Sequence, residues 1–173
     1  MTITIERAGR LHLSEWAALR AELWPDEDAE QHGAELAETL SAGRDRDFAC
    51  VALTAEGRCI GFAEAALRSD YVNGCETSPV VFLEGIYVAE PYRRSGIARM
   101  LCHAVEAWGR ERGCAEFASD AAIDNLASLA LHRALGFVET ERVVFFRKTV
   151  GARHARRLNG EGGLRRAQAF AFT

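Results

Sequence analysis

The sequence predicts an α/β (α+β) fold in which helices flank one mixed central sheet. Short apolar runs of strand length are interspersed with longer segments whose apolar residues recur at helical spacing. Glycine or proline separates most of these segments. The predicted order of elements is β-α-α-β-β-β-α-β-α-β, an arrangement that packs helices against a sheet. With 173 residues, the chain is long enough to bury the core of one domain.

The chain is expected to begin with a short strand and two helices. Residues 3–7 alternate as a strand does. Helical spacing of apolar residues predicts a helix over residues 11–24, and Pro25 ends it because proline disfavours the α conformation of the preceding residue. A second helix is predicted over residues 29–42, ended by Gly43.

Three strands are predicted next. Residues 48–54 and 59–67 are apolar runs joined by the short connection 55–58, which predicts a hairpin. Residues 68–79 contain the turn pair Asn-Gly and are expected to form a loop. Residues 80–88 then read as a strongly apolar, buried strand.

The C-terminal half is predicted to alternate helix and strand. A helix is expected over residues 96–112, a short strand over 116–120, and a helix over 125–135 that Gly136 closes. Residues 138–148 are expected to form a last long strand. A single terminal strand would leave an exposed sheet edge, so pairing of that strand in a homodimer is predicted.

Charge divides the chain into a body and a tail. Residues 1–150 carry 16 basic and 24 acidic residues and are predicted to be one domain with a net charge near −8. Residues 151–173 carry five arginines and are predicted to be a basic, poorly ordered tail. An acidic body disfavours nucleic acid and suits a cationic small molecule, although a solvated acidic surface explains the charge equally well.

The five cysteines are scattered, with no Cys-x-x-Cys pair and no flanking histidine. This pattern predicts reduced thiols in the cytoplasm, with neither a metal site nor a disulfide framework. No secretory signal is visible, and no apolar run approaches the roughly 20 residues that a membrane span requires. Neither membrane insertion nor membrane binding is therefore expected.

The most informative stretch follows the apolar strand 80–88. Pro91 breaks the strand, and a helix begins near Ser95 and Gly96. Helix N-termini present unpaired N–H groups and partial positive charge, which suit a phosphate. Gly96 allows close backbone approach, while Arg93 and Arg94 add charge. On these residues alone, a capped helix with surface arginines is an equal alternative.

Two linked motifs resemble the GCN5-related N-acetyltransferase (GNAT) superfamily. The first is Arg93-Arg94-Ser95-Gly96-Ile97-Ala98 after an apolar strand, and the second is Asn125 followed by Leu131-His132-Arg133-Ala134-Leu135-Gly136-Phe137. The resemblance covers about residues 3–148 and implies a GNAT-type sheet and acetyl-CoA as co-substrate. It implies that the cofactor contacts lie at Ile86, Tyr87, Val88, Arg93, Arg94, Ser95, Gly96, Ile97, Ala98 and Asn125.

His132 stands where many relatives have a tyrosine that protonates the departing thiolate. Three possibilities remain open for it. The imidazole could supply the proton, the thiolate could leave unaided, or His132 could be an ordinary packed or exposed helical residue.

Acetyl transfer to an amine requires a base, because an alkylammonium with an ordinary pKa of about 10 must first lose a proton. Glu84 interrupts the apolar strand 80–88, and Asp120 ends the next strand. If the two strands are parallel neighbours, both acids lie at the same end of the sheet, where ligands bind in such folds. Glu84 is the stronger candidate because an unpaired buried charge is too costly to be incidental.

Further segments closely resemble bacterial aminoglycoside 6′-N-acetyltransferases. They are residues 19–25, 70–74, 78–88, 113–120 and 136–142. The resemblance implies that the antibiotic site is lined by Trp24, Tyr71, Glu84 and Asp120, with Glu139 and Glu141 at its rim. Carboxylates and aromatic rings suit a polycation with sugar faces.

The implied activity is acetyl transfer from acetyl-CoA to the 6′-amine of an aminoglycoside. An acetyltransferase for a polyamine or another small amine, and an inactive acyl-CoA-binding module, are the alternatives.

Overall fold

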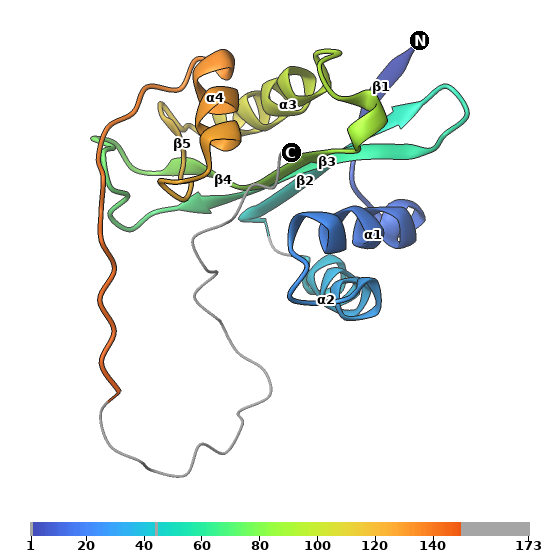
Figure 1. Cartoon of the computed structure of the whole chain (residues 1–173), viewed down its shortest axis with the longest axis horizontal. Helices are drawn as coiled ribbons and strands as arrows, with labels where there is room; N and C mark the ends of the chain where they lie inside the picture. The colour runs from blue at the N-terminus through green and yellow to red at the C-terminus, as the bar shows by residue number, and fades with distance from the viewer. Residues whose placement is uncertain (1, 44, 150–173) are drawn as a thin grey trace.

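The computed structural model describes residues 2–43 and 45–149 and contains one mixed five-stranded sheet (Figure 1). The strands lie in the order in which they occur along the chain. The first four are antiparallel neighbours, and the fifth runs parallel to the fourth. The strands are β1 (Ile3–Arg7), β2 (Asp47–Thr54), β3 (Cys59–Arg68), β4 (Val80–Val88) and β5 (Phe117–Ser119).

Helices cover both faces of this sheet, as predicted (Figure 1). One face carries α1 (Leu13–Leu23) and α2 (Ala29–Ala42), and the other carries α3 (Ile97–Glu111) and α4 (Leu126–Leu135). Two short 3-10 helices, η1 (Arg10–His12) and η2 (Glu90–Tyr92), precede α1 and α3. Among the described residues, no helix is long and apolar enough to cross a bilayer.

The second helix begins and ends at the predicted residues. At its N-terminus the Asp28 carboxylate accepts a hydrogen bond from the Gln31 amide at 2.9 Å, which satisfies one of the free donors of the first turn. At its C-terminus Gly43 has φ +58°, the left-handed conformation that ends many helices. Local capping chemistry alone therefore fixes both ends of α2.

The last predicted strand is wrong for the described residues. Residues 138–149 follow α4 without regular structure and run away from the sheet as an extended trace (Figure 1). Val144, Phe145 and Phe146 are strongly exposed, Phe146 to 94%. The segment has strand-forming residues, but a strand also needs a neighbour to complete its hydrogen bonds, and no strand within residues 2–43 and 45–149 pairs with it. The predicted tail 151–173 lies outside the described residues, so the domain boundary near residue 150 stays a prediction.

A charged pair is buried where α1 packs on β3. The Arg20 Nε lies 3.2 Å from Glu64 Oε1, and their side chains are only 6% and 10% exposed. Trp16 Nε1 donates to the same carboxylate oxygen at 2.9 Å. A buried carboxylate requires such partners because an uncompensated charge in the interior is costly. The pair fixes how α1 sits on the sheet.

Candidate active site

The middle of β4 departs from regular pairing on both of its sides. On the β3 side Glu64 pairs with Gly85 and Ala65 with Leu83, so Glu84 is the extra residue of a β-bulge. On the β5 side the described pairing ends with Leu83 opposite Ser119. Beyond that point β4 and β5 separate, and the β4 backbone from Glu84 onward can pair with a ligand.

Glu84 lies in this bulge and is buried. Its Oε1 accepts a hydrogen bond from an Arg68 guanidinium nitrogen at 3.0 Å. Glu84 is therefore not the unpaired buried charge that was expected, because the side chain of Arg68, the last residue of β3, lies against it. Arg68 also lies over the Phe82 ring at 3.4 Å from the centroid, which holds the guanidinium in place.

Asp120 lies one residue beyond Ser119, just as Glu84 lies one residue beyond Leu83. Because β4 and β5 are parallel, both acids lie at the same end of this strand pair, as expected. Surrounding protein atoms raise the pKa of the Asp120 carboxyl above its ordinary value. The nearby charges of Arg68 and His132 oppose this rise without cancelling it. Asp120 is thus a stronger base than an ordinary aspartate, although its surface remains exposed.

His132 projects from α4 toward β5. Its Nδ1 lies 2.8 Å from the Ser128 carbonyl oxygen, and its Nε2 lies 3.0 Å from the Ser119 hydroxyl. A carbonyl oxygen can only accept, so Nδ1 carries the proton and Nε2 accepts from Ser119. Burial lowers the pKa of the imidazole, which the Ser128 carbonyl and the charge of Asp120 only partly oppose. The ring is therefore neutral near pH 7.

The predicted substrate-site aromatics have different surroundings. Trp24 follows α1 and packs its ring over β4, where a Cβ added to Gly85 would lie 2.6 Å from it. Arg20 lies over the same ring, 5.0 Å from its centroid. Tyr71 instead lies in the loop between β3 and β4 and is 76% exposed. Trp24 is thus held in place by packing, whereas Tyr71 presents its ring to solvent.

The predicted rim acids lie in the segment after α4. This segment contacts the loop between β3 and β4, because a Cβ on Gly74 would meet the Thr140 side chain. Glu139 pairs with Arg142 Nε at 2.5 Å and with Arg133 at 3.6 Å, and these arginines lower its pKa. Glu141 is exposed. Both acids are thus in the chain segment that borders the Tyr71 loop.

A second feature is a cavity of about 880 Å³ between the start of α3 and the side of α4. Gly96 forms part of its wall and caps α3 with φ +85°, a left-handed conformation that favours glycine. The backbone is also left-handed at Arg94, with φ +63°. The cavity is lined by Val88, Glu90, Tyr92, Arg93, Arg94, Gly96, Ile97, Ala98, Arg99, Ala127, Ala130, Leu131, Ala134 and Leu135. It therefore joins the end of β4 to the N-terminus of a long helix.

Within this turn, Arg93 differs from its neighbours. Its Nε donates to the Val88 carbonyl at 2.9 Å, and a terminal nitrogen lies 3.3 Å from the Tyr87 hydroxyl. Tyr87 in turn donates to Glu22 of α1. The Arg93 side chain thus ties the turn to β4, whereas Arg94 and Ser95 are exposed. These bonds hold the Arg93 side chain against β4, whereas the resemblance implies that Arg93 contacts the cofactor.

Asn125 is the N-cap of α4. Its side-chain oxygen accepts a hydrogen bond from the Ser128 amide at 3.0 Å. Residues of α4 line one side of the cavity, so Asn125 contributes to that side by capping the helix N-terminus.

Comparison with known proteins agrees with this architecture. Residues 13–137 match the acetyltransferase (GNAT) family. The chain belongs to this family. The chain is also 54% identical over 140 residues to the aminoglycoside N(6′)-acetyltransferase type 1 of Serratia marcescens, a match that covers 81% of this chain and 94% of that protein. A Salmonella typhimurium protein of the same name is 48% identical over 144 residues, covering 83% and 97%. The family predicted from the two motifs is confirmed.

Solved structures of GNAT proteins are similar over nearly the whole described chain. The aminoglycoside 6′-N-acetyltransferase AAC(6′)-Ih from Acinetobacter baumannii has a TM-score of 0.81 at 47% identity, covering 87% of this chain and all of that one. AAC(6′)-Iy, in complex with the bisubstrate analogue CoA-S-monomethyl-acetylneamine, has a TM-score of 0.80 at 45% identity with the same coverage. The predicted GNAT-type fold is therefore confirmed.

Two residues of this GNAT site were missed by sequence reasoning. Arg68 was placed in a loop, although it is the last residue of β3 and contacts Glu84. Ser119 was not singled out, although it contacts His132. The Arg68–Glu84 contact depends on how β3 pairs with β4, and the Ser119–His132 contact depends on how α4 packs beside β5, so sequence spacing shows neither.

Proposed function

We propose that this chain transfers the acetyl group of acetyl-CoA to the 6′-amino group of aminoglycoside antibiotics. Acetylation removes a positive charge from the antibiotic and would confer resistance. The observation that carries the proposal is the arrangement along β4. Val88 at its end lines a cavity at the α3 N-terminus, and its pairing with β5 puts Glu84 and Asp120 each one residue beyond the last paired residues, Leu83 and Ser119. Relatives of 54% and 48% identity that bear the aminoglycoside name support the choice of substrate.

The cavity beside α3 suits the diphosphate of acetyl-CoA. Free amides at the start of α3 and the partial positive charge of a helix N-terminus favour an anion there. The residues proposed to hold it are Arg93, Arg94, Ser95, Gly96, Ile97 and Ala98, with Arg93 acting mainly by shaping the turn. The pantetheine would pair with the β4 backbone at Ile86, Tyr87 and Val88, with Asn125 nearby.

Replacing Gly96 by alanine should weaken acetyl-CoA binding. The left-handed conformation costs a non-glycine residue about 1–2 kcal/mol, equivalent to roughly a tenfold loss if the turn relaxes in the free protein. Space is not the cause, since an added Cβ meets nothing within 4 Å. Titration calorimetry with acetyl-CoA measures the effect. Gly57→Ala is the matched control, because Gly57 also has a left-handed φ, +81°, with nothing within 4 Å of an added Cβ, and lies between β2 and β3, outside the cavity. Equal weakening by both changes would contradict a local effect at the α3 turn.

The two carboxylates are proposed to prepare the amine for attack. The ammonium gives a proton to Glu84 or Asp120, directly or through water, and its nitrogen then attacks the thioester carbonyl carbon. The carbon–sulfur bond breaks, the thiolate leaves with its electron pair, and the nitrogen releases its second proton, directly or through water, to the departing thiolate. Amides of the β4 bulge can stabilise the charge that develops on the carbonyl oxygen.

His132 is proposed to position Ser119 and thereby Asp120. A neutral ring whose only N–H donates to the Ser128 carbonyl cannot supply a proton to the thiolate without first being charged. The geometry therefore favours departure of the thiolate without a proton from His132. The tyrosine-like acid role expected from the resemblance is the alternative.

A pH–rate profile tests both acid–base assignments. Because the pKa of Asp120 is raised, kcat/KM should fall as the pH drops through a value above that of an ordinary aspartate. Asp120→Asn should lower kcat/KM and move this acidic limb to lower pH. His132→Asn, whose amide can still donate to Ser128, should keep the limb and lose less than about tenfold in rate. An unchanged limb in Asp120→Asn, or loss of a basic limb in His132→Asn, would contradict the assignments.

The substrate is proposed to lie between the acids and the loop that follows β3. Trp24 would form a fixed apolar platform, and Tyr71 a movable one that covers a sugar face. Glu139 and Glu141 would attract the remaining ammonium groups at the rim. This charge pattern fits a polycation.

We further propose that the chain acts as a homodimer. Val144, Phe145 and Phe146 are exposed, and the β5 edge of the sheet has no further strand among residues 2–43 and 45–149. A second chain would bury the apolar side chains and complete the backbone bonds of both segments. Sedimentation velocity at micromolar concentration should show a dimer that the Phe145→Ser/Phe146→Ser double variant shifts toward monomer. Only monomer in the unaltered protein would contradict the proposal.

The five cysteines are free thiols, which suits the reducing cytoplasm proposed as the site of action. Thiol release from acetyl-CoA, measured with aminoglycosides and with linear polyamines, tests the proposed activity. Aminoglycosides should be preferred by kcat/KM. Preference for the polyamines would support the alternative substrate class, and no turnover of either would support an inactive acyl-CoA-binding module.

A further inference from the structure

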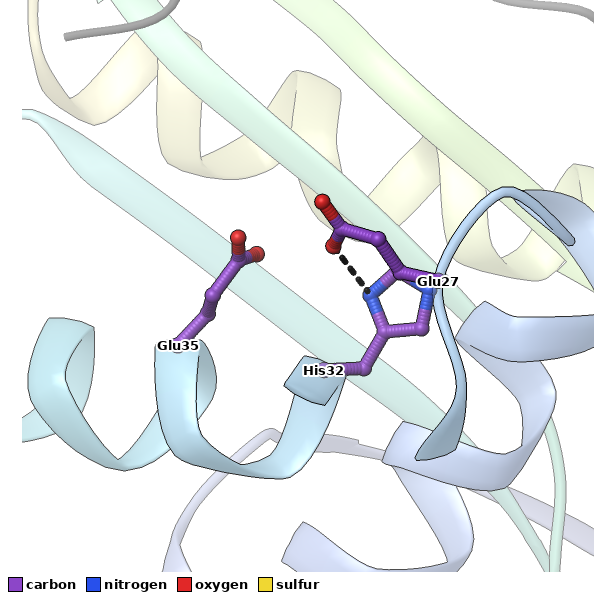
Figure 2. Close-up of side chains that lie close together, drawn as sticks. All are labelled: Glu27, His32 and Glu35. Carbon is purple, nitrogen blue, oxygen red and sulfur yellow. Dashed lines mark ion pairs between the residues drawn. The ribbon is translucent and has the colours of Figure 1, made fainter. Parts of the chain in front are cut away.

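Three side chains gather where α2 begins. Glu27 lies in the turn before α2, while His32 and Glu35 lie one turn apart on the helix (Figure 2). One ligand atom from each residue lies within 4.8 Å of the other two. We infer that Glu27, His32 and Glu35 bind a divalent transition-metal ion, with zinc the best chemical fit.

The His32 ring is the observation that points to a cation. Its Nε2 lies 3.1 Å from the Trp24 carbonyl oxygen, which can only accept, so Nε2 carries a proton. Its Nδ1 is buried and makes no hydrogen bond with any described residue. Figure 2 shows this nitrogen directed at the Glu27 carboxylate, 3.8 Å away. In the neutral ring, a buried lone pair faces a carboxylate, an arrangement that a metal ion between them makes favourable.

The hydrogen bond on the far side of the ring is one that metal-binding histidines commonly make. Such histidines usually donate their second N–H to a carbonyl or a carboxylate, which fixes the tautomer and the ring orientation. Here the Trp24 carbonyl accepts this hydrogen bond, and His32 is only 2% exposed. The ligating nitrogen is thus held in position before an ion arrives.

The two carboxylates can close on the ion. Zinc binds oxygen and nitrogen at about 2.0–2.2 Å, so ligand atoms around it are at most about 4 Å apart. Both glutamate side chains are about half exposed and can rotate by the small distance required. One imidazole, two carboxylates and water complete a tetrahedral site, a ligand set that suits zinc.

Arg20 is the one charge that competes among the neighbouring described groups. Its NH1 lies 3.4 Å from Glu35 Oε2, but its Nε also pairs with Glu64. When Glu35 turns to the ion, Arg20 keeps its buried partner. Metal binding then requires only a small local rearrangement and leaves the Arg20–Glu64 pair under α1 intact. The bound ion would also hold His32, which contacts the Trp24 backbone, in place on α2.

Zinc titration of untagged protein, followed by calorimetry, tests this site. One ion should bind per chain, and Co²⁺ bound in its place should show no thiolate charge-transfer band, since the ligands contain no cysteine. His32→Gln keeps a nitrogen that can donate to the Trp24 carbonyl but removes the ligating atom. Glu27→Gln changes an exposed side chain that folding does not require. Each change should weaken zinc binding at least about tenfold.

Glu30→Gln is the matched control, because Glu30 is an exposed acid of the same helix on its opposite side. It should leave zinc affinity unchanged. Zinc should also raise the melting temperature of the unaltered protein and of Glu30→Gln, but not of Glu27→Gln. Absence of stoichiometric binding, binding that neither Glu27→Gln nor His32→Gln weakens, or a thiolate band with Co²⁺ would each overturn the inference.

Discussion

Glu84→Gln is expected to lower kcat/KM for a 6′-amino aminoglycoside by about 10²–10⁴-fold, the usual contribution of a positioned base. The substitution keeps the shape of the side chain and its place in the β4 bulge, but it removes the proton acceptor and the charge that Arg68 and the substrate ammonium share. Acetyl-CoA binding should change little, because its proposed cavity lies farther along β4. Steady-state kinetics and calorimetry measure the two quantities separately.

The matched control for this experiment is Glu38→Gln, which neutralises an exposed acid on α2. It should leave both quantities unchanged and so exclude a general effect of net charge on a polycationic substrate. If Glu84→Gln keeps full turnover, Glu84 is not the base, and Asp120 must carry the proton alone.

Arg20→Met is expected to have the largest effect on stability, a loss of about 3–5 kcal/mol in the free energy of unfolding. Methionine fills a similar volume, so the loss comes mainly from leaving the buried Glu64 carboxylate without the guanidinium that lies against it. Urea denaturation followed by circular dichroism measures the change.

The double variant Arg20→Met/Glu64→Gln separates charge from packing. Glutamine keeps an oxygen that can accept from Trp16, so much of the lost stability should return. A double variant as unstable as Arg20→Met alone would show that Arg20 stabilises α1 through packing on Trp24, and not through its charge.

Local patterns predicted the elements whose ends depend on their own residues. The helix over residues 29–42 is confirmed because Asp28 and Gly43 cap it without help from the rest of the chain. The predicted strand 138–148 was wrong because strand-forming residues also need a neighbouring strand, and the described part of the chain provides none beside Phe145 and Phe146. Strand propensity identified residues that can form a strand, but it could not show whether a neighbouring strand is present to pair with them.

In the candidate site, too, local sequence predicted some features, whereas others depend on how distant segments pack. The motif around Gly96 predicted a helix N-terminus, which is confirmed, whereas the left-handed conformation of Gly96 was not predicted. The Glu84–Arg68 pair could not be predicted, because it depends on the antiparallel register of β3 and β4 and on a one-residue bulge. The proposed site at His32 could not be predicted either, since a histidine and two glutamates are common on ordinary helices and only the fold brings Glu27, His32 and Glu35 together.

The most direct test of the central claim compares two aminoglycosides that are identical except for an amine or a hydroxyl at the 6′ carbon. Thiol release from acetyl-CoA is measured with each, and the acetylated position in the product is assigned by NMR. The 6′-amino compound should be turned over and carry its acetyl group on the 6′ nitrogen, while the 6′-hydroxy compound should give little or no thiol. Equal rates on the two compounds, or acetylation at another amine, would contradict the proposed function.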